Sequence, residues 1–283
     1  MSKVGAYVQI MRPVNCLMMG FAVLVGSVLA ESDLLKLSWQ DLAYGFVAGF
    51  ALTAASMAIN DYVDREIDAI NEPKRPIPSG LMKPRGALGF AFVLTAIGFA
   101  AAYPISALTL VIAAVSWAVF TTYTLVGKRS GLPGNFLVSM CVAIPFIYGS
   151  VVATNAIQLN VLTFVAMVFL SNTGREITKG IVDMEGDRKQ NVKTVAVRFG
   201  DKTAAIGAAL FYISATLLSP IPVLLGLVSF WFIPFVAVTD IGLVLSSVAL
   251  LKDHSRESAR RIKRIVLLWF MIGLMAFLVG AAR

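Results

Sequence analysis

The sequence has little cysteine, histidine or charge. Its two cysteines, Cys16 and Cys141, each lie inside an apolar run, so neither a disulfide framework nor a thiolate metal site is expected. The single histidine, His254, lies in a charged loop without a second histidine as a metal-binding partner. Charged residues make up 14% of the 283 residues and hydrophobic residues 58%. This composition excludes a soluble globule of this length.

Long apolar stretches fill most of the chain. A helix needs about 20 apolar residues to cross the hydrocarbon core of a bilayer. Nine stretches qualify: residues 13–30, 41–60, 87–104, 107–126, 134–153, 161–178, 203–220, 229–251 and 262–282. The first resembles a signal peptide, but the later spans indicate a retained helix. We predict an all-α, polytopic membrane bundle of nine transmembrane helices, forming one domain over residues 1–283.

The basic residues indicate how the chain is oriented. The net charge of +8 would suit nucleic acid, yet 22 of the 24 Lys and Arg residues fall in alternate connections between the spans. These connections are the N-terminal segment and residues 61–86, 127–133, 175–202 and 252–264. The positive-inside rule therefore predicts a cell-membrane protein with a cytoplasmic N-terminus and an outside C-terminus, and no nucleic-acid partner.

Acidic residues concentrate in two segments on the side predicted to be cytoplasmic. In the first, Asn60, Asp64 and Asp68 recur every four residues, so a helix would stack them on one face beside Asp61. In the second, Lys179, Asp183 and Asp187 repeat the same spacing. Each segment follows an even-numbered predicted span, and their sequences are weakly similar. This pattern indicates an internal duplication that brings both motifs to one central cavity.

Oxygen ligands in such numbers suit magnesium. Mg²⁺ takes a few ligands from protein and the rest from water and substrate phosphates. Six residues are predicted metal ligands: Asn60, Asp61, Asp64, Asp68, Asp183 and Asp187. Nearby cations could bind phosphate oxygens: Lys179, Arg65, Lys74 and Arg75. A single D-x-x-x-D motif is more often a solvated helix face, but two matched clusters favour a metal–diphosphate site.

The chain resembles the UbiA superfamily of intramembrane prenyltransferases over essentially its whole length. The first segment matches the family's N-D-x-x-D-x-x-x-D pattern at Asn60, Asp61, Asp64 and Asp68, followed by R-P-I-P-S-G at residues 75–80. The second matches D-x-x-x-D at Asp183 and Asp187. Residues 12–15, 70–80 and 175–187 look most like archaeal members that act on a glycerol-phosphate lipid.

This resemblance implies Mg²⁺-dependent transfer of a prenyl group from an allylic diphosphate to an acceptor. In the archaeal members the group is geranylgeranyl and the acceptor is the free hydroxyl of geranylgeranylglyceryl phosphate, a precursor of ether lipids. Asp64, Asp68, Asp183, Asp187 and Lys179 are then the expected catalytic residues. Metal ions and basic side chains would stabilise the departing diphosphate, and a closed cavity would exclude water from the carbocation.

Four further residues are weaker candidates for substrate binding. Arg12 and Asn15 begin the first span and could hold an acceptor phosphate, although Arg12 also suits a topology signal. Tyr123 and Lys128 flank the fourth connection, where an interfacial aromatic and a snorkelling lysine are common. Asp240 lies in the middle of the eighth span and must face the bundle, with no assigned task.

Two other activities remain open on the sequence, and a third is excluded. An aromatic prenyltransferase acting on a 4-hydroxybenzoate-type acceptor would need the same donor site. A secondary transporter would also have repeats and charged residues in the membrane, but its ion site would lie at the midplane. A CDP-alcohol phosphotransferase would need a D-x-x-D-G-x-x-A-R run that the chain lacks.

Overall fold

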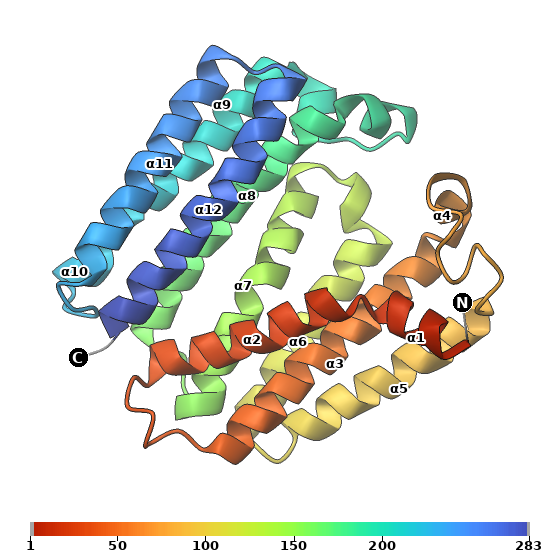
Figure 1. Cartoon of the computed structure of the whole chain (residues 1–283), viewed down its shortest axis with the longest axis horizontal. Helices are drawn as coiled ribbons and strands as arrows, with labels where there is room; N and C mark the ends of the chain where they lie inside the picture. The colour runs from red at the N-terminus through yellow and green to blue at the C-terminus, as the bar shows by residue number, and fades with distance from the viewer. Residues whose placement is uncertain (1–2, 282–283) are drawn as a thin grey trace. The chain divides into compact units, whose positions relative to one another are not determined.

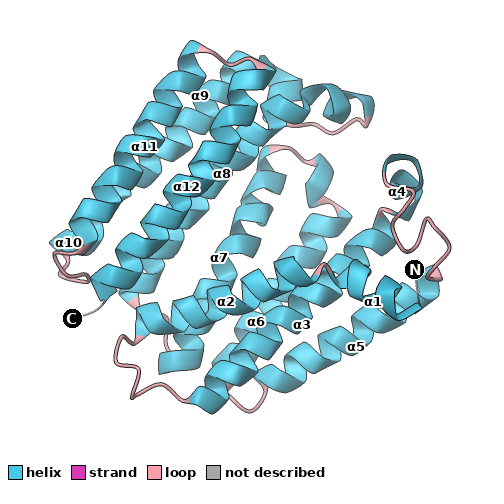
Figure 2. Ribbon diagram, viewed as in Figure 1, coloured by secondary structure: helices cyan, strands magenta, loops and turns pink. Residues whose placement is uncertain are grey.

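The computed structural model describes residues 3–281, and every regular element among them is helical (Figures 1 and 2). The helices are α1 (Lys3–Met11), α2 (Pro13–Ala30), α3 (Trp39–Val63), α4 (Arg65–Asn71), α5 (Pro84–Ala102), α6 (Ala107–Leu125), α7 (Leu132–Thr154), α8 (Leu159–Lys189), α9 (Val195–Leu218), α10 (Ile221–Leu224), α11 (Phe232–Lys252) and α12 (Arg256–Ala281). A 3-10 turn, Gly127–Arg129, connects α6 to α7. The predicted all-α class is therefore confirmed for the described residues.

Eight of these helices are long and apolar enough to cross a membrane, which makes the chain a multi-pass membrane protein. The sequence predicted nine transmembrane helices. The remaining predicted span, residues 161–178, lies inside α8, whose 31 residues carry Arg175, Glu176, Lys179 and Asp183 and have too low a hydropathy. The predicted outside C-terminus and the chain's first residue lie beyond the described residues.

The chain forms two compact units. Unit 1 comprises Met1–Leu125 with Ile144–Ile157, and unit 2 comprises Val126–Ala143 with Gln158–Arg283. The boundary therefore falls within α7, next to Pro145, which lacks the amide that would continue the helical hydrogen-bond ladder. The first acidic motif belongs to unit 1 and the second to unit 2.

In unit 1, small residues allow α3 to pack closely against its neighbours. The buried positions of α3 include Gly45, Ala48, Ala51, Ala54 and Ala58, and α2 and α5 both pack against this helix. Lipid tails are as apolar as leucine, so helices in membranes associate through close van der Waals contact between small side chains. This packing therefore holds α3 in place up to its last residue, Val63, and the first motif continues beyond the end of this helix.

A close backbone approach in unit 1 joins α2 to the second half of α7. Ser27 Oγ donates a hydrogen bond to the Gly149 carbonyl oxygen at 2.8 Å. A Cβ atom on Gly149 would collide with the Val23 carbonyl oxygen, and one on Gly26 would collide with the Phe146 backbone. Both neighbours are backbone atoms, so neither can move aside without shifting a helix.

We expect Gly149→Ala to lower the unfolding free energy by about 2 kcal/mol, because overpacking a close contact forces backbone shifts. Gly89→Ala is the matched control, since a Cβ there meets no atom within 4 Å and alanine favours a helix. Denaturant titration in mixed micelles measures both variants. Equal stabilities for the two would show that α2 and α7 do not touch at Gly149.

In unit 2, α8 packs against α9 and α12. The Thr178 and Tyr212 hydroxyls share a buried hydrogen bond of 3.0 Å that joins α8 to α9. Helix α12 runs antiparallel to α8, because Phe277 packs edge-to-face against Phe164 near one end, with ring centroids 4.8 Å apart, and Arg256 contacts Val182 near the other. These contacts fix the C-terminal half of α8, which carries the second motif.

Candidate functional site

The first acidic motif spans the junction of α3 and α4. Helix α3 ends at Val63 and α4 begins at Arg65, with Asp64 between them at φ −83° and ψ 0°. Helical hydrogen bonding continues across the junction, since the Asp64 amide donates to Asn60 and the Asp68 amide donates to Asp64. Asn60 Nδ2 also donates to Asp64 Oδ2 at 3.1 Å. The amide oxygen of Asn60 and the carboxylate of Asp64 therefore lie together, as the spacing predicted.

Asp61 and Asp68 form a second pair, which two arginines hold together. Arg75 Nη1 lies 2.6 Å from Asp68 Oδ2 and 3.4 Å from Asp61 Oδ1. Arg12 Nη2 lies 2.6 Å from the same Asp61 oxygen. Asp61 is 3% exposed and Asp68 6% exposed, so both carboxylates require this charge compensation. The sequence predicted one ligand set, whereas the structure divides it into two pairs with different partners.

The segment after the first motif fixes Arg75 in place. Ile77 and Met82 are buried in a cluster with Ala6, Ile10 and Ala58. The Met82 amide donates to the Pro76 carbonyl at 2.9 Å, and Gly80 turns the chain at φ +77°. Glycine adopts such a backbone without strain. The R-P-I-P-S-G tail is thus an anchored turn that aims one arginine at two carboxylates.

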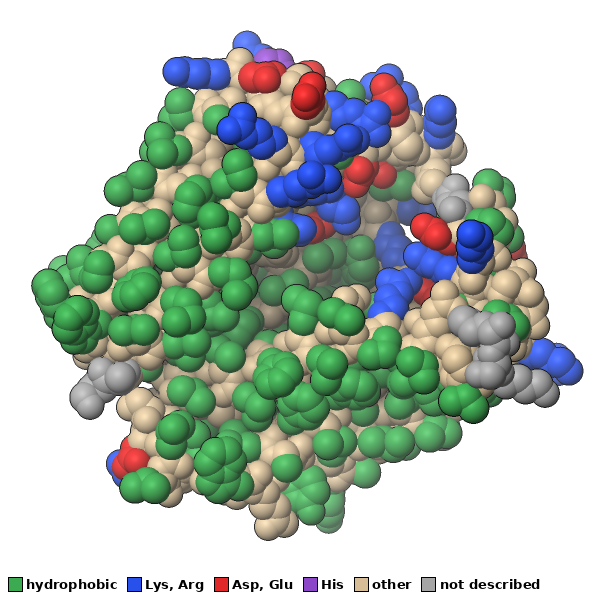
Figure 3. All heavy atoms as spheres, viewed as in Figure 1, with side chains coloured by type: hydrophobic (Ala, Val, Ile, Leu, Met, Phe, Trp, Pro, Cys, Tyr) green, Lys and Arg blue, Asp and Glu red, His purple; other side chains and the backbone are tan. Residues whose placement is uncertain are grey.

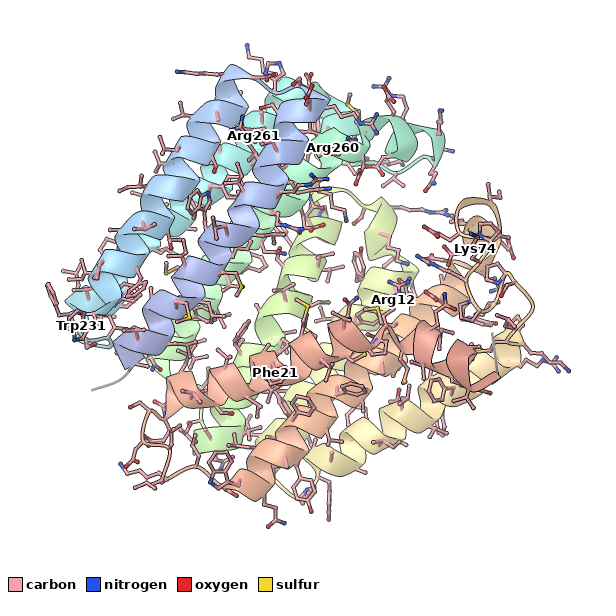
Figure 4. The ribbon with its side chains drawn as sticks, viewed as in Figure 1. Arg12, Phe21, Lys74, Trp231, Arg260 and Arg261 are labelled. Atoms are coloured by element: carbon pink, nitrogen blue, oxygen red, sulfur yellow. The ribbon has the colours of Figure 1, made fainter. Side chains whose placement is uncertain are left out.

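Arg12 lies where the chain turns sharply between α1 and α2. Its φ is +52°, a left-handed conformation that is uncommon for a side chain of this size. Pro13 follows at the first position of α2 and disfavours a helical conformation for the residue before it. Figure 4 shows Arg12 on the turn between the two helices. The ion pair with Asp61 therefore connects this turn to the end of α3.

The second motif lies on the last turns of α8. Asp183 and Asp187 are one helical turn apart and half-buried. Lys179, one turn earlier, is 3.5 Å from Glu176, and Glu176 also accepts from Arg175 at 3.0 Å. Since α8 is a single helix across these positions, Lys179 and the two aspartates share one face as their spacing predicted, and Glu176 lies on the same face.

The loop after α8 turns back towards Asp187. Thr194 caps α9 and also makes a side-chain hydrogen bond to Asp187. Burial raises the pKa of the Asp187 carboxyl, and the charge of Asp183 raises that pKa further, while Lys179 and the Thr194 bond oppose the rise. The Lys193 amide donates to the Arg129 carbonyl at 3.3 Å. The loop and the 3-10 turn thus pack together beside the second motif.

Other predicted residues are less engaged. Arg65 turns towards Tyr62, with its guanidinium 4.8 Å from the ring centroid and 2.9 Å from the Tyr62 carbonyl. Lys74 and Asn15 are exposed, and Figure 4 shows Lys74 beside α4. Tyr123 belongs to unit 1 and Lys128 to unit 2, each with interactions of its own. Within residues 3–281, the side chains of Arg65, Lys74 and Asn15 therefore lie outside the arginine–aspartate network.

Sequence reasoning missed Arg256. Its Nε donates to the Val182 carbonyl at 2.9 Å, and its Nη1 lies 3.7 Å from Glu185. Because Arg256 is 74 residues from Val182, no local pattern indicates this contact. The one sequence feature that marks Arg256 is its position at the start of a run of basic residues. Asp240, left without a task, accepts a hydrogen bond from Ser219 at 2.5 Å, which joins α9 to α11.

The oxygen atoms of the two acidic motifs can be compared with the ligands that Mg²⁺ requires. No group of three or more His, Cys, Asp or Glu side chains within residues 3–281 is placed to hold a metal ion by itself. Each motif instead presents adjacent oxygen donors, Asn60 with Asp64 and Asp183 with Asp187. Mg²⁺ is commonly bound by one or two carboxylates and completed by substrate phosphates and water. The residues therefore fit an ion that arrives with a diphosphate.

Two acidic motifs at helix ends in an all-helical, multi-pass protein are the arrangement expected of an enzyme that works at a membrane. The chain belongs to the UbiA prenyltransferase family, whose model matches residues 19–279. Digeranylgeranylglyceryl phosphate synthase of Archaeoglobus fulgidus is 36% identical over 96% of this chain and 94% of its own length. The synthase of the same name from Korarchaeum cryptofilum is 34% identical over 100% of this chain and 99% of its own.

Solved structures share the fold. One, from work on digeranylgeranylglyceryl phosphate synthase in membranes, has a TM-score of 0.88 at 30% identity and covers 100% of this chain and 99% of its own. A UbiA homologue from Archaeoglobus fulgidus, bound to GPP and Mg²⁺, has a TM-score of 0.70 at 17% identity, with 96% and 99% covered. At that lower identity only the helical architecture is shared.

Proposed function

We propose that this protein transfers a geranylgeranyl group from geranylgeranyl diphosphate to the free hydroxyl of geranylgeranylglyceryl phosphate. The product, digeranylgeranylglyceryl phosphate, is the precursor of archaeal ether lipids. The observation that carries the proposal is the pairing of two acidic motifs with a full-length likeness to synthases of one name. The family model covers residues of both units, which supports one domain over residues 1–283.

Each motif is proposed to bind Mg²⁺, through Asn60, Asp64 and Asp68 in unit 1 and through Asp183 and Asp187 in unit 2. Bound Mg²⁺ would supply positive charge to the oxygens of the diphosphate. Lys179 would bind a diphosphate oxygen directly and so favour cleavage of the allylic C–O bond. The prenyl carbon then accepts an electron pair from the acceptor hydroxyl, and the hydroxyl proton passes to the departing diphosphate. Helices that face a central cavity would keep water from the carbocation.

Asp61 has a different role in this proposal. Its carboxylate neutralises and orients Arg12 and Arg75, so that the remaining N–H donors of both guanidiniums are directed at phosphate oxygens. The proposal counts α8 as a transmembrane helix in addition to the other eight, which makes nine. The distribution of basic residues supports a cytoplasmic position for both motifs. Charged residues of α8 would then line the cavity and not face lipid.

An acceptor panel tests the proposed function. Purified full-length protein, reconstituted in neutral lipid with Mg²⁺ and geranylgeranyl diphosphate, is supplied with either geranylgeranylglyceryl phosphate or 4-hydroxybenzoate. We expect prenylated product and diphosphate release with the first acceptor alone, because the relatives with this name match the chain from end to end. Mass spectrometry identifies the product and a phosphate assay follows the diphosphate.

Two results would contradict the proposal. Product with 4-hydroxybenzoate alone would assign an aromatic prenyltransferase of quinone biosynthesis. Ion flux into liposomes without diphosphate release would assign a secondary transporter. Omission of the acceptor is the internal control, since slow hydrolysis of the donor by water also releases diphosphate.

A further inference from the structure

The first three turns of α12 carry an unusual excess of positive charge. Arg256, Arg260, Arg261, Lys263 and Arg264 lie within nine residues that hold one acid, Glu257. Basic side chains gather where α12 begins (Figure 3). A helix start already carries partial positive charge, so basic residues there are electrostatically unfavourable for the helix itself. The stability of α12 therefore does not explain this cluster.

Most of the cluster lies along one side of the helix. The packed side of α12 is defined by Ala259, Ile262 and Val266, which are 0%, 4% and 0% exposed. At about 3.6 residues per turn, one flank of that packed side carries a stripe formed by positions 256, 260, 263 and 264. Arg261 lies on the other flank. Figure 4 labels Arg260 and Arg261 on the first turns of α12. We call Arg256, Arg260, Lys263 and Arg264 the basic stripe.

The basic stripe lies on the α8 side of α12 and begins beside the second acidic motif. Arg256 bonds to Val182, the residue before Asp183. Trp269, on the opposite flank, bonds to Ser246 of α11. Because α12 is antiparallel to α8, Arg260 and Arg264 lie one and two turns further along the membrane span, and Arg264 is about 12 Å from Arg256 along the axis.

The deeper part of the stripe has no acidic partner. Among residues 3–281, Arg260, Lys263 and Arg264 make no ion pair, and Glu176 of α8 is already paired with Arg175 and Lys179. The positive-inside rule accounts for the number of charges near a membrane but not for their alignment on one flank. Charges along a span call for a counter-charge. An anionic ligand would provide it.

The same side of α12 continues as an apolar surface. Leu267, Met271 and Met275 follow Arg260 and Arg264 along it and are 45%, 60% and 45% exposed. Together the two stretches present cationic and then hydrocarbon groups in one line. A lipid with a phosphate head and an apolar chain has matching chemistry, and arginine suits phosphate because its planar guanidinium donates two parallel hydrogen bonds.

We propose that Arg260, Lys263 and Arg264 bind the phosphate of the lipid acceptor, with its hydrocarbon chain along Leu267, Met271 and Met275. This assignment rests on the proposed function. On a glycerol unit the phosphate and the free hydroxyl are only a few bonds apart, so a phosphate on the stripe, which begins beside the second motif, would leave the hydroxyl within reach of that motif. The donor diphosphate has its own partners in the acidic motifs and in Arg12 and Arg75.

The test uses the double variant Arg260→Gln with Arg264→Gln and, as a matched control, Arg261→Gln from the other flank. Each full-length protein is placed in nanodiscs of neutral phosphatidylcholine, and its melting temperature confirms folding. We expect the double variant to raise the KM for geranylgeranylglyceryl phosphate about tenfold or more, since charged hydrogen bonds to phosphate are lost. The donor KM and the control should stay within about twofold of the wild type.

Direct binding separates the possible failures. Acceptor lipid without donor should raise the melting temperature of the wild type and of Arg261→Gln more than that of the double variant. If the wild type neither binds nor converts this acceptor, the proposed function is wrong. If the wild type and the double variant behave alike, the stripe assignment is wrong although the function stands. A raised donor KM in the double variant also overturns the stripe assignment.

A second lipid composition separates the acceptor from bulk phospholipid. Nanodiscs with phosphatidylglycerol offer an anionic head group that is not a substrate. If only the wild type responds to phosphatidylglycerol and the acceptor KM in neutral lipid is unchanged by the double variant, the stripe binds membrane lipid. That outcome overturns the acceptor assignment.

Discussion

Asp183→Ala should abolish Mg²⁺-dependent diphosphate release, with a loss of about 10³-fold or more in kcat. The carboxylate lies one turn from Asp187 on the last part of α8, and its removal leaves the second motif with a single acidic donor. Electrostatic groups that act on the charge developing in a transition state commonly contribute two to three orders of magnitude each. Asp64→Ala should have the same effect through the first motif, where Asn60 would lose its partner.

The matched controls lie beside these residues in the sequence but face solvent. Glu185→Gln removes a charge two residues from Asp183, at a side chain that is 77% exposed. Glu72→Gln does the same after α4. Both should keep at least about half of the wild-type activity, since exposed charges are well screened. A chelator should reproduce the loss in the wild type, and added Mg²⁺ should restore it. Full activity in Asp183→Ala would remove the proposed mechanism.

Asp61→Ala should cause the largest loss of stability among single changes in the acidic motifs. Its carboxylate is almost fully buried and neutralises both Arg12 and Arg75. Removal of one member of a buried ion pair typically costs about 3 kcal/mol, because the remaining charges are left without compensation. Two arginines close together would also repel each other. Reversible denaturation in mixed micelles should show this decrease in unfolding free energy.

Asp33→Ala is the matched control for stability, because it breaks the exposed pair of Asp33 with Lys36 in the same unit. Exposed pairs contribute little, so a change of less than about 1 kcal/mol is expected. A second measurement addresses function. Asp61→Asn keeps the side-chain volume and should raise the donor KM as the guanidiniums lose their orientation. If Asp61→Ala were as stable as Asp33→Ala, the arginine–aspartate network would not exist in solution.

The sequence by itself determined the long apolar helices, the membrane class and the type of chemistry. Apolar length alone placed α2 at residues 13–30, because a span needs a fixed number of apolar residues. The four-residue spacing of Asn60, Asp64 and Asp68 placed candidate oxygen ligands on successive helical turns, because the helical period is fixed by backbone geometry. Of the nine predicted spans, residues 161–178 differ from the other eight, because α8 begins with apolar residues and ends with charged ones in one continuous helix.

Only the tertiary structure decided which of these side chains work together. Arg12 is 49 residues from Asp61, and Arg256 is 74 residues from Val182, and no local pattern encodes either distance. Asp61 and Asp68 have a different partner from Asn60 and Asp64, because both of them contact Arg75. The anchored turn after α4 brings Arg75 back to the end of α3. Pairing is decided by which charges become buried together, because burial makes an unpaired charge costly. The sequence therefore specified the candidate ligands, and the packing of distant helices decided which charged side chains contact them.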